Sequence, residues 1–151
     1  MSTLELDPAL VVTLRALEEH DVEFLLVGEV AEAVHADGGF VTGVAIVPGA
    51  YTRNAERLRA ALLALDARLL DAGGGEHDLR RADLRALSPC TLQTPHADIE
   101  VSFQPPATGG YRDLFDEAVR VPLAPGVRPL VASPEDLERI ARGADVTARR
   151  A

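Results

Sequence analysis

The chain has 151 residues, and its 24 acidic residues outnumber the 15 arginines, which gives a formal charge of −9. This length fits one domain over residues 1–151, and 47% hydrophobic residues are enough for a core, which excludes global disorder. The acidic balance argues against a nucleic-acid binder, because phosphate contacts need positive charge. The only cysteine, Cys90, excludes an intramolecular disulfide, and its sequence context favours a buried side chain over a nucleophile.

The N-terminus is acidic and lacks the basic and apolar regions of a signal peptide. No apolar run approaches the roughly 18 residues that a membrane span needs. We therefore expect a cytoplasmic protein with no membrane partner.

The first half of the chain predicts alternating helices and strands. Asp7 and Pro8 are typical of a helix start, because Asp caps free N–H groups and Pro lacks one. The predicted elements are a helix over 7–20, a strand over 22–27 ended by Gly28, a helix over 29–36, a turn at 37–39, a strand over 40–47, and an amphipathic helix over 53–66 capped by Thr52.

The second half predicts further mixed structure after a glycine-rich loop. The predicted elements are a loop at Gly73–Gly75, strands over 91–94 and 98–103, a helix over 111–119, a strand over 127–131, and a final helix that starts at Ser133. Apolar and polar residues alternate over 98–103, so Asp98 and Glu100 share one face of that strand.

Three segments in this order resemble the minimal nucleotidyltransferase family. LLVGEVAEAVHADGGFVTGVAIV resembles its core, HADIEVSFQPPATGGYRDLFDEA its third-carboxylate segment, and VASPEDLERIARGAD its C-terminal helix. The resemblance spans roughly residues 10–145. It implies an α/β (α+β) fold in which a small mixed sheet has helices packed mainly on one face.

Individual positions keep the family's fold signals and lose its chemical ones. Gly28 and His35 match the family's turn glycine and helix histidine, whereas Glu29 and Ala36 replace glycines. The remaining departures are Gly39 for an arginine, Val41 for a threonine, Gly43 and Ala45 for the two aspartates of Asp-x-Asp, and Ala141 for a lysine. A register shifted by one residue would put Val44 and Ile46 at the aspartate positions, and neither choice supplies a carboxylate. Glu100 takes the third carboxylate position.

Nucleotidyl transfer depends on two Mg²⁺ ions about 3.5–4 Å apart, which carboxylates hold against the substrate phosphates. Because Gly43 and Ala45 offer a metal no ligand, the resemblance implies a degenerate member without catalytic residues, metal or cofactor. We expect it to bind a partner protein or a ligand in a remodelled cleft. The candidate cleft residues are Gly28, Glu29, His35, Asp98 and Glu100.

Two alternatives remain open. The chain could be an active enzyme that transfers NMP from an NTP to a small molecule, protein or RNA. Relocated carboxylates, Glu29, Asp98 and Glu100, would then hold Mg²⁺, with His35 as a further candidate ligand. The chain could also form a homo-oligomer.

Overall fold

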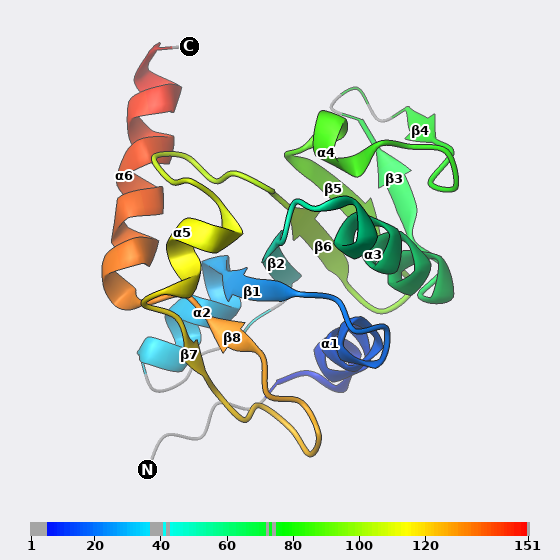
Figure 1. The fold of residues 1–151 in the computed structure, drawn as a ribbon, viewed down its shortest axis with the longest axis horizontal. Helices are drawn as coiled ribbons and strands as arrows, with labels where there is room; N and C mark the ends of the chain where they lie inside the picture. Colours follow the sequence, from blue (N-terminus) through cyan, green and yellow to red (C-terminus); the bar gives the residue numbers. More distant parts are fainter. Residues whose placement is uncertain (1–5, 37–40, 42, 72, 74, 151) are drawn as a thin grey trace.

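The computed structural model describes residues 6–36, 41, 43–71, 73 and 75–150, which form a mixed α and β structure (Figure 1). The helices are α1 (Pro8–Glu19), α2 (Gly28–His35), α3 (Thr52–Ala64), α4 (Leu84–Leu87), α5 (Tyr111–Phe115) and α6 (Pro134–Arg150). The strands are β1 (Phe24–Val27), β2 (Gly43–Pro48), β3 (Arg68–Leu70), β4 (Glu76–His77), β5 (Cys90–Gln93), β6 (Asp98–Val101), β7 (Val119–Arg120) and β8 (Leu130–Val131).

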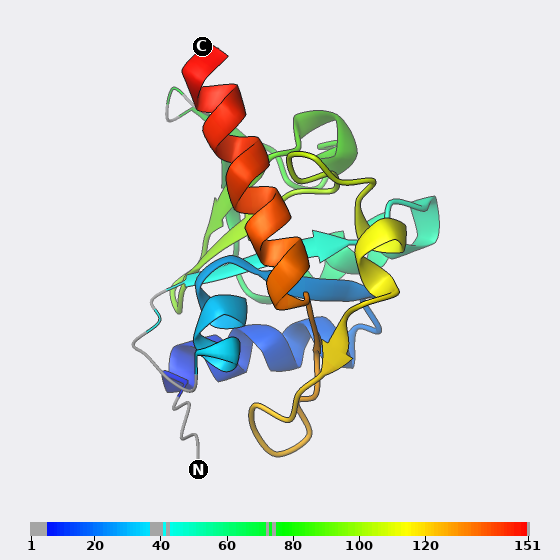
Figure 2. The same ribbon diagram turned by 90° about the vertical axis from the view of Figure 1, so that its left-hand side faces the viewer.

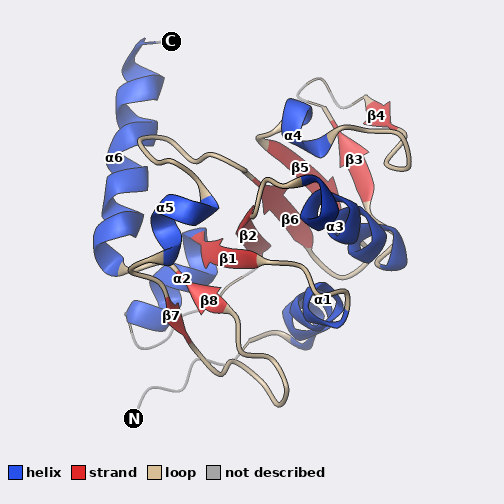
Figure 3. Ribbon diagram, in the orientation of Figure 1, coloured by secondary structure: helices blue, strands red, loops and turns tan. Residues whose placement is uncertain are grey.

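All these strands belong to one sheet with the order β4-β3-β5-β6-β2-β1-β8-β7 (Figure 3). The central strand β2 is antiparallel to β1 and parallel to β6, while β1 is parallel to β8. Strands distant in sequence therefore meet at the centre of the sheet, where β2 lies between β1 and β6.

Helices pack on both faces of this sheet. On one face, apolar residues of α1 and α3 join Leu26 and Ile46 in the larger hydrophobic cluster. On the other face, Leu25, Val27 and Val47 form a second cluster with α5 and α6. In two views at right angles, α6 projects beyond the sheet, away from α1 (Figures 1 and 2). The uninterrupted apolar run of β1 reflects this arrangement, because all four of its residues are buried.

A fully buried asparagine fixes α3 to the sheet. Asn54 accepts a hydrogen bond from the Glu23 backbone N–H at 2.7 Å. Its amide group donates to the carbonyl oxygens of Glu23 (2.8 Å) and Gly49 (2.9 Å). The start of β1 and the end of β2 are therefore held by one side chain.

The mixed fold predicted from the sequence is confirmed, and most predicted elements occur within a few residues of their expected bounds. The Asp7 cap is confirmed by its hydrogen bond to the Ala9 N–H at 2.9 Å. Thr52 as a cap is wrong, because it is the first residue of α3 and the cap position is Tyr51. The helix expected over 111–119 ends at Phe115, and β7 follows. The turn at 37–39 and the start of the strand expected from residue 40 lie outside the described residues.

Candidate functional site

Gly28 places the start of α2 directly against β2. Its φ angle is +68°, a left-handed conformation that favours glycine. A Cβ atom at this position would lie 3.0 Å from the Cβ of Ala45, closer than ordinary contact. The tight turn therefore places the first residues of α2, including Glu29, close to β2.

The pairing of β2 with β6 decides which side chains meet beside this turn. In the parallel ladder, Gly43 pairs with Asp98 and Ala45 pairs with Glu100. Residues directly paired across neighbouring strands point to the same face. Of these two strands, β6 therefore presents carboxylates on this face, those of Asp98 and Glu100. β2 presents the hydrogen atom of Gly43 and the methyl group of Ala45.

These residues line a cavity of about 380 Å³, which we call the acidic pocket. Four carboxylates lie around it, and no described residue that lines it is basic. Its lining residues are Gly28, Glu29, Glu32, Gly43, Val44, Ala45, Thr91, Asp98 and Glu100. The negative charge of these carboxylates disfavours a phosphate group that has no cation bound to it, and it favours a positively charged group.

A larger cavity of about 1020 Å³, the main cleft, adjoins the acidic pocket. The two cavities share Gly28, Ala45, Thr91 and Glu100. Most other walls of the main cleft are apolar, and they come from Val27, Ile46, Leu69, Leu70, Leu87, Pro89, Val101, Pro105, Pro106 and Ile140. This volume is typical of a site for a small molecule or a short segment of a partner.

The β3–β4 turn adds polar residues to the rim of the main cleft that sequence reasoning did not assign to it. Asp71 accepts hydrogen bonds from the N–H groups of Gly75 (2.8 Å) and Gly73 (2.9 Å). These bonds, that from Gly75 first, lower the pKa of Asp71. The Nε2 atom of His77 lies 3.2 Å from the same carboxylate. The contact between Asp71 and His77 could not be predicted, because the glycines of Gly73–Gly75 give no periodic sequence pattern.

Cys90 also lines the main cleft. Burial raises the pKa of its thiol, so the protonated form dominates at neutral pH. This environment agrees with a packing side chain and not with an activated nucleophile.

His35 is the one candidate residue that the structure places away from both cavities. Its Nε2 atom lies 2.7 Å from the carbonyl oxygen of Ala132. Because a carbonyl oxygen only accepts, His35 donates here, and the bond ties the end of α2 to the segment between β8 and α6. The other four candidates, Gly28, Glu29, Asp98 and Glu100, line the acidic pocket together.

The residues present do not fit a pair of Mg²⁺ ions. The ladder partners of Asp98 and Glu100 on β2 are Gly43 and Ala45, which carry no oxygen ligands in their side chains. Among the described residues, no group of three or more His, Cys, Asp or Glu side chains could hold a metal ion.

Comparisons with known proteins assign no family to the chain. No protein-family model matches it, and no curated protein sequence matches it significantly. Within the part of the chain that the structure describes, none of the helices has the length and apolar character of a membrane span.

Proposed function

We propose that this chain is a catalytically degenerate nucleotidyltransferase-like protein that acts by binding. The observation that carries the proposal is the β2–β6 ladder, in which Gly43 and Ala45 face Asp98 and Glu100. A transferase of the family that the sequence resembles would need carboxylates from both strands. Gly28 forms its tight turn beside this ladder, while β2 supplies no carboxylate.

The shape and charge of the cleft indicate what it binds. The main cleft offers apolar walls, and the acidic pocket at its end offers Glu29, Glu32, Asp98 and Glu100 without a basic residue among its lining. A matching occupant has an apolar body and a cationic end, such as an amine or guanidinium group. This group could belong to a small ligand or to a side chain of a partner protein.

Thermal unfolding with and without ligands tests this proposal. We expect no shift with any NTP plus Mg²⁺ or Mn²⁺, and a rise in Tm with an amphipathic amine such as dodecylamine below its micellar concentration. A ligand at 100 times its Kd adds about 2.7 kcal/mol, which corresponds to several degrees at about 2–4 °C per kcal/mol. Glu100→Gln should abolish most of the shift with the amine.

Glu138→Gln is the matched control, because Glu138 is exposed on α6 and lines neither cavity. An equal loss of the shift in both variants would indicate attraction to the acidic protein as a whole and would contradict the cationic occupant. A metal-dependent shift with an NTP that Glu100→Gln removes would instead favour the active enzyme with relocated carboxylates.

A further inference from the structure

A second groove lies at the opposite end of β1 from the candidate site. Its volume is about 820 Å³, and it is bounded by the turn after α1, by α3, by α5 and by the hairpin that joins β7 to β8. Phe24 at the start of β1 lines it, whereas Gly28, which follows the end of β1, lines the acidic pocket. The two sites share no lining residue. We call this second site the α5 groove.

The α5 groove is lined by three arginines and three carboxylates, so it is far less acidic than the chain as a whole. Arg57, Arg120 and Arg128 line it. Within the described residues, the guanidinium groups of Arg57 and Arg128 have no hydrogen-bond or ion-pair partner, while Arg120 donates to the carbonyl oxygen of Arg128 at 2.9 Å. An arginine without a carboxylate is available to an incoming negative group.

Two of the three carboxylates that line the groove already accept hydrogen bonds. Glu18 accepts from the backbone N–H of Arg128 at 3.1 Å. Glu23 accepts from the hydroxyl of Tyr51, and this bond is the main cause of the raised pKa of Tyr51. All three carboxylates keep their negative charge, but none of them forms an ion pair with an arginine of the groove within the described residues.

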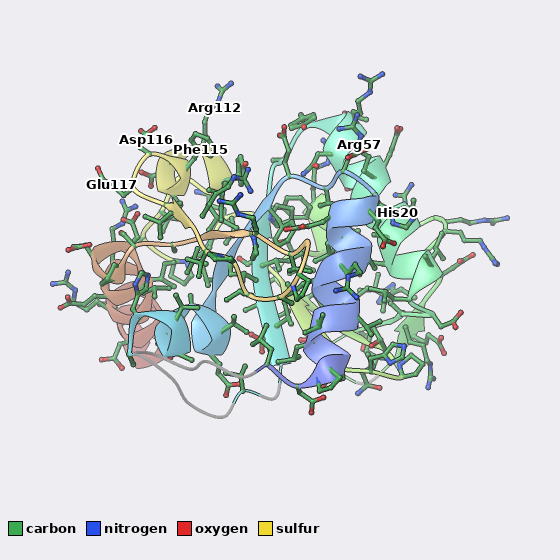
Figure 4. The ribbon with its side chains drawn as sticks, turned by 90° about the horizontal axis from the view of Figure 1, so that it is seen from below. His20, Arg57, Arg112, Phe115, Asp116 and Glu117 are labelled. Carbon is green, nitrogen blue, oxygen red and sulfur yellow. The ribbon has the colours of Figure 1, made fainter. Side chains whose placement is uncertain are left out.

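The end of α5 forms a ridge along the same groove. Phe115 lines the groove and is 48% exposed, and the exposed residues Asp116 and Glu117 follow it. Figure 4 shows these three residues on one side and Arg57 and His20 on the other. Neither Asp116 nor Glu117 has an ion pair within the described part of the chain. An exposed aromatic ring and unpaired charges of both signs thus border one groove.

We propose that a second copy of this chain docks here, with the α5 ridge of each subunit in the α5 groove of the other. A two-fold dimer uses the same patch twice, so that patch must carry both complementary halves. Phe115 and Tyr111, which both line the groove, provide the aromatic contact typical of interface cores, and arginine is likewise enriched there. Two copies with a formal charge of −9 repel each other, except where arginines gather.

The docking brings opposite charges together twice. Glu117 of each subunit lies toward Arg57 of the other, and Asp116 extends the same negative ridge. Light scattering over protein concentrations from about 1 µM to about 1 mM, a range that covers moderate to weak affinity, tests this arrangement. We expect a mass of twice 16.1 kDa that falls to that of one chain on dilution.

Charge-reversal variants test whether the dimer forms through the α5 groove. Arg57→Glu and Glu117→Arg should each raise the Kd of the dimer by at least about 100-fold, because two symmetry-related pairs are reversed at once. An equimolar mixture of the two variants should recover a dimer, since both contacts then join opposite charges. Arg53→Glu and Glu138→Arg are matched controls on exposed positions outside the groove, and they should leave the dimer intact.

A monomer at every concentration would overturn the proposal. So would a dimer that neither reversal weakens, because its interface would lie elsewhere. Failure of the mixture to recover a dimer would also contradict the pairing. Glu117 is exposed, so Glu117→Arg keeps the experiment decisive if Arg57→Glu lowers the yield of folded protein.

Discussion

Gly28 carries two separate structural demands, and a pair of alanine substitutions can tell them apart. At φ +68° an alanine is strained by about 1–2 kcal/mol. Its Cβ would also lie 3.0 Å from that of Ala45, so α2 or β2 would have to move. We expect Gly28→Ala to lower the free energy of unfolding in urea by more than the strain alone.

Gly126→Ala is the matched control for Gly28→Ala. Gly126 has φ +74°, and an added Cβ there would meet no atom of the described residues within 4 Å. Gly126→Ala should therefore lower the free energy of unfolding only by the strain of about 1–2 kcal/mol. Equal losses in the two variants would contradict a close approach of α2 to β2, and with it the geometry of the acidic pocket.

Single residues also show how far sequence reasoning reaches. Gly28 and Glu100 were predicted because a strand-ending glycine and an alternating strand leave local patterns. The role of His35 could not be predicted, since its partner Ala132 lies 97 positions away in the chain. The role of His77 could not be predicted for a similar reason. Its contact with Asp71 depends on a turn whose glycines fix no conformation from sequence alone.

At the scale of elements, one ion-pair network joins α5 to α6. The Nη2 atom of Arg139 on α6 lies 3.0 Å from Asp113 on α5 and 3.0 Å from Asp136. The carboxylate of Asp113 also accepts the N–H of Gly109 at 2.8 Å. This backbone bond first, and then Arg139, lowers the pKa of Asp113 below its ordinary value of 3.8.

A lowered pKa in the folded state fixes the direction of the pH dependence. The stability that Asp113 contributes is present above its ordinary pKa and is lost as pH falls through the lower folded value. We expect Asp113→Asn to unfold at a lower urea concentration than the unsubstituted chain at pH 7. This difference should shrink steadily as the pH falls below about 4, where the unfolded carboxyl group becomes protonated.

Urea unfolding from pH 7 to pH 3 measures this convergence. Glu138→Gln removes an exposed carboxylate from α6 and should show no comparable difference at pH 7. A gap between Asp113→Asn and the unsubstituted chain that stays constant over the whole range would mean that charge on Asp113 does not hold α5 to α6.

Element prediction succeeded where a segment is long or strongly patterned. The amphipathic pattern over residues 53–66 gave α3 to within two residues. The segments β3, β4 and α4 were not predicted, because they have only two to four residues each. The two strands also depend on pairing with each other and with β5. The second helical layer of α5 and α6 was equally hidden, although the uninterrupted apolar run of β1 was a usable signal for it.

At the scale of the whole molecule, the fold can be kept while the chemistry of its cleft changes. The core contacts that build the sheet involve Val44 and Ile46, which point to the opposite face from Gly43 and Ala45. Substitutions at Gly43 and Ala45 therefore leave the side chains of Val44 and Ile46 in the larger hydrophobic cluster.

The same reasoning predicts that a metal site can be built into the cleft. Gly43→Asp combined with Ala45→Asp would place carboxylates directly beside Asp98 and Glu100 on strands about 4.8 Å apart. Among the described residues, a Cβ at Gly43 would meet the carbonyl oxygen of Asp98 alone, at 3.6 Å, which is ordinary contact. We expect the double variant to be less stable without metal, because like charges face each other. Mn²⁺ should then raise its Tm by several degrees, at about 2–4 °C per kcal/mol of binding.

A second double variant, Ala60→Asp with Ala64→Asp, adds the same charge on exposed positions of α3 and should show no rise with Mn²⁺. This comparison separates a built site from general attraction of cations to an acidic protein. If the cleft variant folds and Mn²⁺ leaves its Tm unchanged, β2 and β6 do not present their side chains as a nucleotidyltransferase would. The proposal of a degenerate member of that family would then fail at its central point. A rise confined to the cleft variant would show that two substitutions separate this cleft from one that holds metal.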